Sequence, residues 1–383
     1  MNSASPATIS NSVDFRRTYS SYAMNKKVRD VSFFILLIFC ILCACNRQVA
    51  KAPTPDSLVI FPPPPDTTRI QFLTHFSSSA DLEGKKGGFH RFLFGDEAPL
   101  AIIKPYGVSV HNEKVYICDT GLGGLEIMDL ATGDFKYFIP AGRGQLKLPI
   151  NCCVDQHGYL FVADANRGQI VVFDSDLNYV HAFGESEGFR PTDVEVHQDL
   201  IWVANVEDHA VYVYSADDYK LLERMPDLSS DEDGFIRQST NISISNNRLY
   251  VSDFGDFNVK NYSMEGEYMG VVGGHGNGPG SFTRPKGIDL DREENLFVVD
   301  AAFENVQIFN AEGELLMHFG GAYEGAGAMW LPAAVEISYE NFLFFETYVD
   351  DSFELEYLIF VTNQYGPAKI SVYGKVKEKA RLP

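Results

Sequence analysis

Three groups of side chains in this sequence have the types that bind ligands or take part in catalysis. The first has one oxygen-bearing residue at the end of a short apolar stretch in each of six similar segments: Asp119, Asp164, Asn205, Asp253, Asp300 and Asn363. Oxygen ligands that converge on one axis suit calcium. A residue type that recurs in every segment is better explained by a local task, in which the side chain accepts backbone N–H groups and closes its own loop. We therefore predict a structural, loop-closing role for all six.

Histidines form the second group. We expect His90, His209 and His275 on the face of the fold that receives ligands. Three imidazoles with an open fourth position suit a catalytic zinc ion. Their spacing carries no metal-binding signature, and the sequence contains neither an HExxH nor a Gly-x-Ser-x-Gly motif. No cofactor is certain from the sequence, and a divalent metal, calcium or zinc, in a central channel is one alternative.

The third group is basic. Lys104, Arg190 and Arg284 each stand immediately before a proline that opens an apolar strand, and His275 lies shortly before Arg284. The chain carries a net charge of −21, so basic side chains gathered in one place would form a local anion site on an acidic protein. These four residues are our predicted ligand-binding set. The alternative is that each basic side chain pairs with a neighbouring carboxylate.

A repeat carries these side chains. Segments such as "VYICDTG", "LFVADAN", "LYVSDFG" and "LFVVDAA" recur, most of them roughly 45 residues apart. Each is preceded by an apolar strand and a polar turn, and is followed by two further short strands, as in "NVQIFNAE" and "GELLMHFGG". Four short strands repeated six times, with no helical period between them, predict an all-β fold, a six-bladed β-propeller.

The ends of the chain are predicted to meet in the last blade. The sixth unit has three strands and then runs into the charged segment 375–383. The stretch "RIQFLTHFS", which starts at Arg69, has the alternation of a fourth strand. We expect this N-terminal strand to close the ring, because a closed ring leaves no sheet edge at the seam. The propeller is accordingly predicted to span residues 69–374.

The segment before the propeller resembles a targeting signal. In "NKKVRDVSFFILLIFCILCAC", basic residues precede an apolar run that is shorter than the roughly 18 residues of a membrane span. The run ends at Leu42-Cys43-Ala44-Cys45, which resembles a bacterial lipoprotein cleavage box with Cys45 as the lipidated residue. We interpret residues 1–44 as a mis-assigned start plus a lipoprotein signal peptide, and 45–68 as a Pro-rich tether. A cleaved signal without a lipid is the alternative.

Two long repeats carry a family resemblance. The stretch "LPINCCVDQHGYLFVADANRGQIVVFDSDLNYVHAFG" from Leu148 and the segment 276–320 resemble NHL repeats. The chain from Cys45 onward resembles the NHL-repeat six-bladed propeller lipoproteins of bacterial envelopes. The resemblance implies an NHL-type propeller but leaves the activity open, because such propellers include lyases, lactonases, synthases and binding modules. Amidating lyases of this kind use a zinc ion held by histidines.

An aromatic insertion marks the last unit. Residues 339–356, "YENFLFFETYVDDSFELE", interrupt the repeat. Their aromatic side chains either form an exposed docking patch for a partner or cover the seam between the last and first units, and we favour the seam. Cys118 is also left with two alternatives, a free thiol or a disulfide with Cys152 or Cys153.

Composition narrows the partners. The acidic balance excludes nucleic acid, which needs basic patches, and no CxxCH motif for covalent haem occurs. Our leading hypothesis is a lipid-anchored β-propeller of the cell envelope, at the outer membrane of a Gram-negative bacterium, that acts as a protein-binding or scaffolding subunit for another envelope protein. The alternatives are a metal-dependent lyase or lactonase-type enzyme and a sensor of a small anionic ligand.

Overall fold

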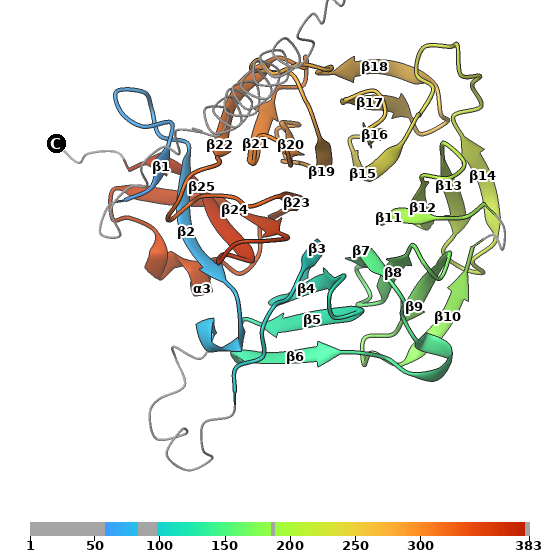
Figure 1. The fold of residues 1–383 in the computed structure, drawn as a ribbon, viewed down its shortest axis with the longest axis horizontal. Helices are drawn as coiled ribbons and strands as arrows, with labels where there is room; N and C mark the ends of the chain where they lie inside the picture. Colours follow the sequence, from blue (N-terminus) through green and yellow to red (C-terminus); the bar gives the residue numbers. More distant parts are fainter. Residues whose placement is uncertain (1–57, 83–97, 185–187, 380–383) are drawn as a thin grey trace, which may run out of the picture. The chain divides into compact units, whose positions relative to one another are not determined.

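Six antiparallel sheets surround a common axis in the computed structural model of this chain (Figure 1). The structure describes residues 58–82, 98–184 and 188–379, all within one compact unit, 50–383. The predicted lipidation site Cys45, the signal segment 1–44 and His90 lie outside the described residues. Among the described residues, no helix has the length and apolarity needed to cross a membrane.

The first five sheets, blades 1 to 5, each contain four consecutive strands. Blades 1 and 2 consist of β3 (Pro105–His111), β4 (Lys114–Asp119), β5 (Gly124–Asp129), β6 (Asp134–Phe138), β7 (Pro149–Val154), β8 (Leu160–Asp164), β9 (Gln169–Phe173) and β10 (Tyr179–Phe183). Blades 3 to 5 consist of β11 (Pro191–His197), β12 (Leu200–Asn205), β13 (Ala210–Ser215), β14 (Leu221–Met225), β15 (Ser239–Ser245), β16 (Arg248–Asp253), β17 (Asn258–Ser263), β18 (Tyr268–Val272), β19 (Pro285–Leu290), β20 (Leu296–Asp300), β21 (Asn305–Phe309) and β22 (Leu315–Gly320).

Burial explains the strand sequences. Second strands such as β8, LFVAD, are buried along their whole length because neighbouring blades cover both faces of the sheet. Fourth strands such as β10, YVHAF, lie at the periphery and are only partly buried. The apolar runs noted in the sequence are therefore the middle strands of each blade, where the hydrophobic effect contributes most.

The first strand of each blade enters at the axis through a proline in five of six cases: Pro105, Pro149, Pro191, Pro285 and Pro332. The register with the second strand shifts just after this residue in every blade. Proline is tolerated at a strand's first residue because its missing N–H is not needed in the ladder there. Ser239 takes this position in blade 4.

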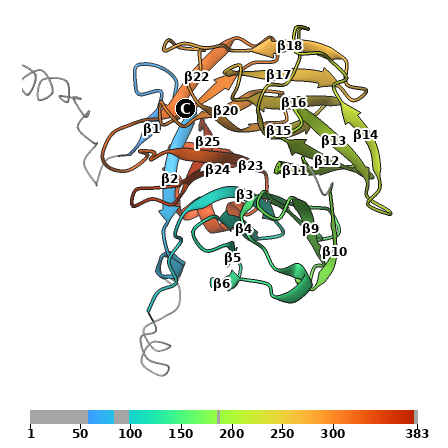
Figure 2. The ribbon, with the colours of Figure 1, turned by 45° about the vertical axis from the view of Figure 1, so that its right-hand side comes forward.

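Blade 6 joins the two ends of the described chain, which confirms the predicted closure of the ring. Its strands, in order from the axis outward, are β23 (Pro332–Ser338), β24 (Phe353–Asn363), β25 (Ile370–Glu378), β2 (Ile70–Phe76) and the short β1 (Ile60–Phe61). Strand β2 pairs antiparallel with β25, with Phe76 opposite Ile370, and the two lie side by side in both views (Figures 1 and 2). The strand β25 continues into the segment that the sequence assigned to a charged tail, because the long β24 pairs with it up to Glu378.

The aromatic insertion packs over the seam between blades 6 and 1. It forms α3 (Phe342–Phe345) and the 3-10 turn η4 (Glu346–Tyr348). The described residues also contain the 3-10 turns η1 (Ser79–Asp81) and η3 (Gly142–Gly144). Phe345 is completely buried, with ring centroids 6.4 Å from Phe76 and 5.7 Å from Phe360. The same apolar cluster includes Val108 and Ile117 of blade 1. These contacts connect blade 6, the N-terminal strand and blade 1.

Candidate functional site at the channel mouth

The six first strands surround the axis of the ring (Figure 1). Residues of these strands line a channel, and at one end of it lies a pocket that we call the mouth pocket. The pocket has a volume of about 500 Å³, within the usual range for small-molecule sites. Its polar lining comes from blades 1, 3, 4 and 5 and from the loops between their strands, and includes Tyr106, Arg190, Thr192, Glu207, His209, Arg237, Gln238, Ser239, Thr240 and Lys286.

Buried Asp and Asn side chains fix the loops around the mouth pocket. Asp119 is completely buried, and its Oδ2 accepts the backbone N–H groups of Ile103 and Lys104 at 2.8 and 2.7 Å. Its Oδ1 accepts two further N–H groups from its own loop. The equivalent bonds in the other blades run to Asp164, Asn205, Asp253, Asp300 and Asn363, all completely buried. These oxygens hold the chain just before each first strand, and they accept mainly backbone N–H groups, with the Lys260 ammonium as a further donor to Asp253.

Lys286 spans part of the channel entrance. It is the second residue of β19 in blade 5, and its Nζ donates a hydrogen bond to the hydroxyl of Tyr106 in blade 1. The ammonium lies 4.9 Å from the centroid of the Tyr106 ring. Blade 6 lies between these two blades and has only Ala333 and Ala334 at the corresponding positions, so the lysine passes over it. No carboxylate pairs with Lys286 among the described residues, and its charge is available to a ligand.

Arg190 supplies a second available cation. Its backbone is held by Asn205, whose Oδ1 accepts the Arg190 N–H at 2.8 Å. The side chain is exposed, and its guanidinium has no ion-pair partner within the described part of the chain. Glu207 is the one carboxylate among the described residues that line the pocket. The mouth pocket is therefore positively charged on a protein whose net charge is −21.

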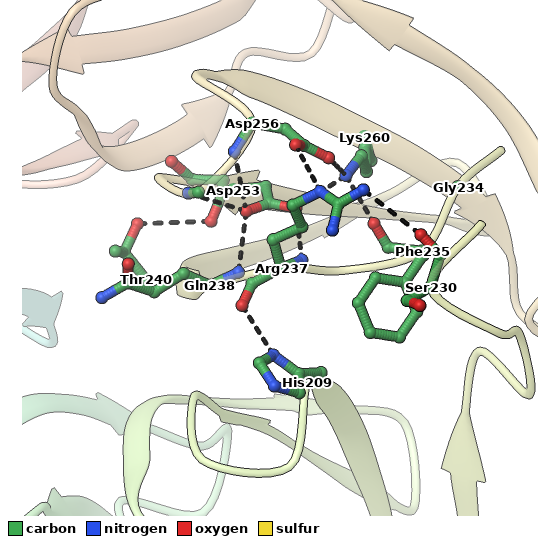
Figure 3. Close-up of polar contacts among 12 residues, drawn as sticks. His209, Ser230, Gly234, Phe235, Arg237, Gln238, Thr240, Asp253, Asp256 and Lys260 are labelled. Atoms are coloured by element: carbon green, nitrogen blue, oxygen red, sulfur yellow. Dashed lines mark hydrogen bonds and ion pairs between the residues drawn. The ribbon is translucent and has the colours of Figure 1, made fainter. Parts of the chain in front are cut away.

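Arg237 lines the pocket and makes several polar contacts (Figure 3). Its Nε lies 2.8 Å from Asp256 Oδ1, and its carbonyl oxygen is 2.6 Å from His209 Nδ1. Asp256 also contacts Lys260, an almost completely buried lysine whose Nζ donates to Asp253 Oδ2 at 2.7 Å and to the Phe235 carbonyl at 2.6 Å. Arg237 is thus neutralised locally and contributes shape more than charge.

Of the four residues predicted to bind an anion, the structure brings only Arg190 into the mouth pocket. The Nζ of Lys104 lies 5.6 Å from the ring centroid of Tyr365 instead. Arg284 is exposed outside the pocket lining, and His275 packs on Phe257 with ring centroids 4.5 Å apart. The sequence interpretation missed Lys286 and Tyr106. Their signal was their register, because each directly follows the first-strand proline.

The predicted histidine metal site stays a prediction, because only two of its three histidines are among the described residues. His90 lies outside them, and His209 uses its Nδ1 on the Arg237 carbonyl. In residues 58–82, 98–184 and 188–379, no group of three or more His, Cys, Asp or Glu side chains is arranged to hold a metal ion. Cys118, Cys152 and Cys153 are free thiols, and burial raises the pKa of Cys118 and of Cys153.

Comparison with known proteins agrees with this architecture. The model of a family described as a 6-bladed beta-propeller matches residues 226–381, which include the whole of blades 4 and 5 and most of blade 6. The fold and this match identify the chain as a six-bladed β-propeller. No significant match occurs among curated proteins.

Solved structures with the same fold are distant in sequence. A structural genomics protein of unknown function from Bacteroides thetaiotaomicron is 12% identical, with a TM-score of 0.55 over 81% of this chain and 76% of that one. A gluconolactonase from Xanthomonas campestris is 18% identical, with a TM-score of 0.51 over 86% and 100%. A catalytically inactive virginiamycin B lyase from Staphylococcus aureus with quinupristin is 13% identical, with a TM-score of 0.50 over 71% and 95%. At these identities, the likeness shows the fold alone.

Proposed function

We propose that this chain is a binding subunit, attached to the cell envelope by a lipid on Cys45, whose mouth pocket receives an anionic group of its partner. The observation that carries the proposal is the pair Lys286 and Arg190. Both line one pocket of about 500 Å³, and neither is paired with a carboxylate among the described residues.

The proposed ligand group is a carboxylate or a phosphate. Lys286 donates to the hydroxyl oxygen of Tyr106, so the hydroxyl proton of Tyr106 points elsewhere and can be donated to an anion. Arg190 adds a planar guanidinium, which matches the oxygens of either group. Charge-assisted hydrogen bonds of this kind contribute about 1.5–3 kcal/mol each.

We favour binding over catalysis because of how the polar groups of the pocket are engaged. The imidazole of His209 is held by the Arg237 carbonyl, and Thr192 and Thr240 donate to backbone carbonyls. Within the described residues, the pocket contains no hydroxyl or thiol hydrogen-bonded to a histidine or carboxylate, which is the arrangement that activates a nucleophile. An adaptor needs the anion-binding geometry alone.

The first test is calorimetric. The full chain in detergent is titrated with citrate and with inorganic phosphate, together with the Arg190→Ala/Lys286→Ala double variant. The matched control is Lys147→Ala/Arg248→Ala, which removes the same charge outside the pocket. We expect one of the two probes to bind and the mouth variant to lose about tenfold or more in affinity, with the control within about twofold of wild type. Equal losses in both variants, or no binding of either probe, would overturn the proposed anion site.

The second test addresses the partner and the anchor. A photoreactive amino acid is placed at Gln238 in the mouth pocket or at Glu312, which is exposed in the turn between β21 and β22. We expect a defined crosslinked envelope protein from Gln238 only, and its loss in the Arg190→Ala/Lys286→Ala background. Cys45→Ala is expected to move the chain out of the membrane fraction, because the anchoring energy comes from the acyl chains. Retention of that variant in membranes would contradict the lipid anchor.

A further inference from the structure

Deeper in the channel, below the basic mouth pocket, the lining residues are acidic instead. The first strands enclose a cavity of about 290 Å³. The fifth residues of these strands form a ring, called here the lower ring, of Ser109, Cys153, Glu195, Ser243, Asp289 and Glu336. The third residues form the upper ring of Gly107, Asn151, Asp193, Asn241, Gly287 and Ala334. Four carboxyl groups thus line the cavity, while no Lys, Arg or His among the described residues does.

In two of the four carboxyl groups, both oxygens accept hydrogen bonds from other groups of the protein. Asp193 accepts four hydrogen bonds, two from the side chains of Asn151 and Asn241 and two from backbone N–H groups. Asp289 accepts bonds from Ser243 Oγ and two backbone N–H groups, one of them in blade 6. Because these bonds cross from blade to blade, Asp193 and Asp289 help to hold neighbouring blades together.

The other two carboxyl groups keep a free oxygen. Glu195 Oε1 accepts the backbone N–H of Ile244 at 3.2 Å, and Glu336 Oε1 accepts that of Val110 at 3.1 Å. The Oε2 atom of each has no hydrogen-bond partner among the described residues. Each glutamate therefore presents one unused acceptor toward the cavity.

Asn241 provides an independent sign of a missing ligand. Only 3% of the surface of this residue is exposed, and it lines the same cavity. Its Nδ2 donates to Asp193 at 3.3 Å, whereas its carbonyl oxygen Oδ1 has no partner in the described structure. A buried acceptor without a donor costs about 1–3 kcal/mol, so such atoms normally bind something. A donor from outside the chain would satisfy it.

The buried carboxyl groups also lack a counter-charge. Burial raises the pKa of Asp193 to about 7 and that of Asp289 to about 6. Burial, followed by repulsion from Asp289, raises the pKa values of Glu195 and Glu336 well above their usual range. A bound cation would relieve this repulsion, and its binding would release protons.

We infer that the channel binds a primary alkyl ammonium group, with Glu195 Oε2, Glu336 Oε2 and Asn241 Oδ1 as its acceptors. The acceptors come from blades 3, 6 and 4, and the described residues form no set arranged to hold a metal ion. An ammonium on a flexible chain tolerates such spacing, because its N–H donors reach acceptors in several directions. The same chemistry is offered by a lysine side chain of a partner and by a free diamine.

The experiment uses calorimetry with 1,5-diaminopentane, Nα-acetyl-lysine amide, calcium chloride and the neutral 1,5-pentanediol. We expect both amines to bind the full chain at pH 7.5 with release of protons, and more weakly at pH 5.5, where the carboxyl groups of Asp193, Glu195, Asp289 and Glu336 hold more protons. Burial raises the pKa of the Cys153 thiol, which therefore stays protonated at both pH values. The variant Glu195→Gln/Glu336→Gln, whose amide oxygens can still accept the two backbone N–H groups, is expected to weaken amine binding at least tenfold. A thermal unfolding curve for this variant shows whether the ring is intact.

The proposal fails if the glutamine variant, folded, binds the amines as well as wild type. It also fails if the diol binds equally, or if calcium binds tighter and displaces the amines. If both amines bind, the tighter one identifies the source as a protein lysine or a free diamine. The variant Arg190→Ala/Lys286→Ala is expected to retain amine binding, so this site and the anion site of the mouth pocket can fail separately.

Discussion

Replacing Glu126 by glutamine should stabilise the protein above neutral pH. Glu126 lies in the third strand of blade 1 and is completely buried. Neither of its carboxyl oxygens has a hydrogen-bond partner of normal geometry in the described structure, although Asp119 lies close enough to repel it. Burial, followed by this repulsion, raises the pKa of Glu126 to about 10.

The size of the effect follows from proton linkage. In the unfolded chain a glutamate titrates near a pKa of about 4.3, so between that pH and about 10 the unfolded state loses a proton that the folded state keeps. The stability contributed by the protonated group is complete below about pH 4.3 and is lost as the pH rises, by about 1.4 kcal/mol per unit. At pH 7.5 the loss approaches about 4 kcal/mol, and local relaxation around the buried group makes about 2–4 kcal/mol the expected range.

Glutamine cannot ionise, so Glu126→Gln removes this loss while keeping the shape of the side chain. Urea unfolding of wild type and variant at pH 5, 6, 7 and 8 measures the difference in stability. We expect little difference at pH 5 and a growing advantage of the variant at higher pH. Glu223→Gln, in the exposed part of β14, is the matched control and should show a smaller pH-dependent difference. A difference for Glu126→Gln that stays constant from pH 5 to pH 8 would refute the reasoning, because Glu126 would then be ionised in the folded state.

Two further predictions concern packing and buried charge. Lys260→Met should destabilise the protein by about 3–5 kcal/mol, because it leaves Asp253 and Asp256 without their buried cation; denaturant unfolding measures this, and Lys260→Met/Asp256→Asn should recover part of the loss. A denaturant unfolding midpoint of Lys260→Met equal to that of wild type would contradict the expected loss of stability. Phe76→Ala should cost about 3–5 kcal/mol and speed hydrogen exchange in β2 and β25 more than in blade 3, since Phe76 joins the closing strand to the buried Phe345. Uniform exchange across all blades would contradict this prediction, because Phe76→Ala would then not loosen β2 and β25 more than the rest of the ring.

Glu126 and Lys260 show what the repeat pattern leaves open. They occupy the same register, since Ile117 pairs with Glu126 in blade 1 and Val251 pairs with Lys260 in blade 4. The lysine lies between two carboxylates and a carbonyl, whereas the glutamate has no partner of normal geometry. The sequence indicates that both lie on third strands. It does not indicate their opposite electrostatic situations, because these depend on loops that approach from elsewhere in the blade.

The sequence by itself determined the six blades, the proline at the start of five first strands and the closure of the ring by an N-terminal strand. The blades and their prolines are local features, because blades 1 to 5 pair strands that are neighbours in the chain. The closure is not local, and it was predictable because the sixth unit lacks a fourth strand of its own. Only the tertiary structure decided which side chains meet. Lys286 and Tyr106 are 180 residues apart, and they come together because the blade between them presents alanines at the axis. The carboxyl groups of the channel likewise meet only when the ring closes. Glu195 in blade 3 and Glu336 in blade 6 belong to blades that are not adjacent in sequence, and only the closed ring brings them into one cavity.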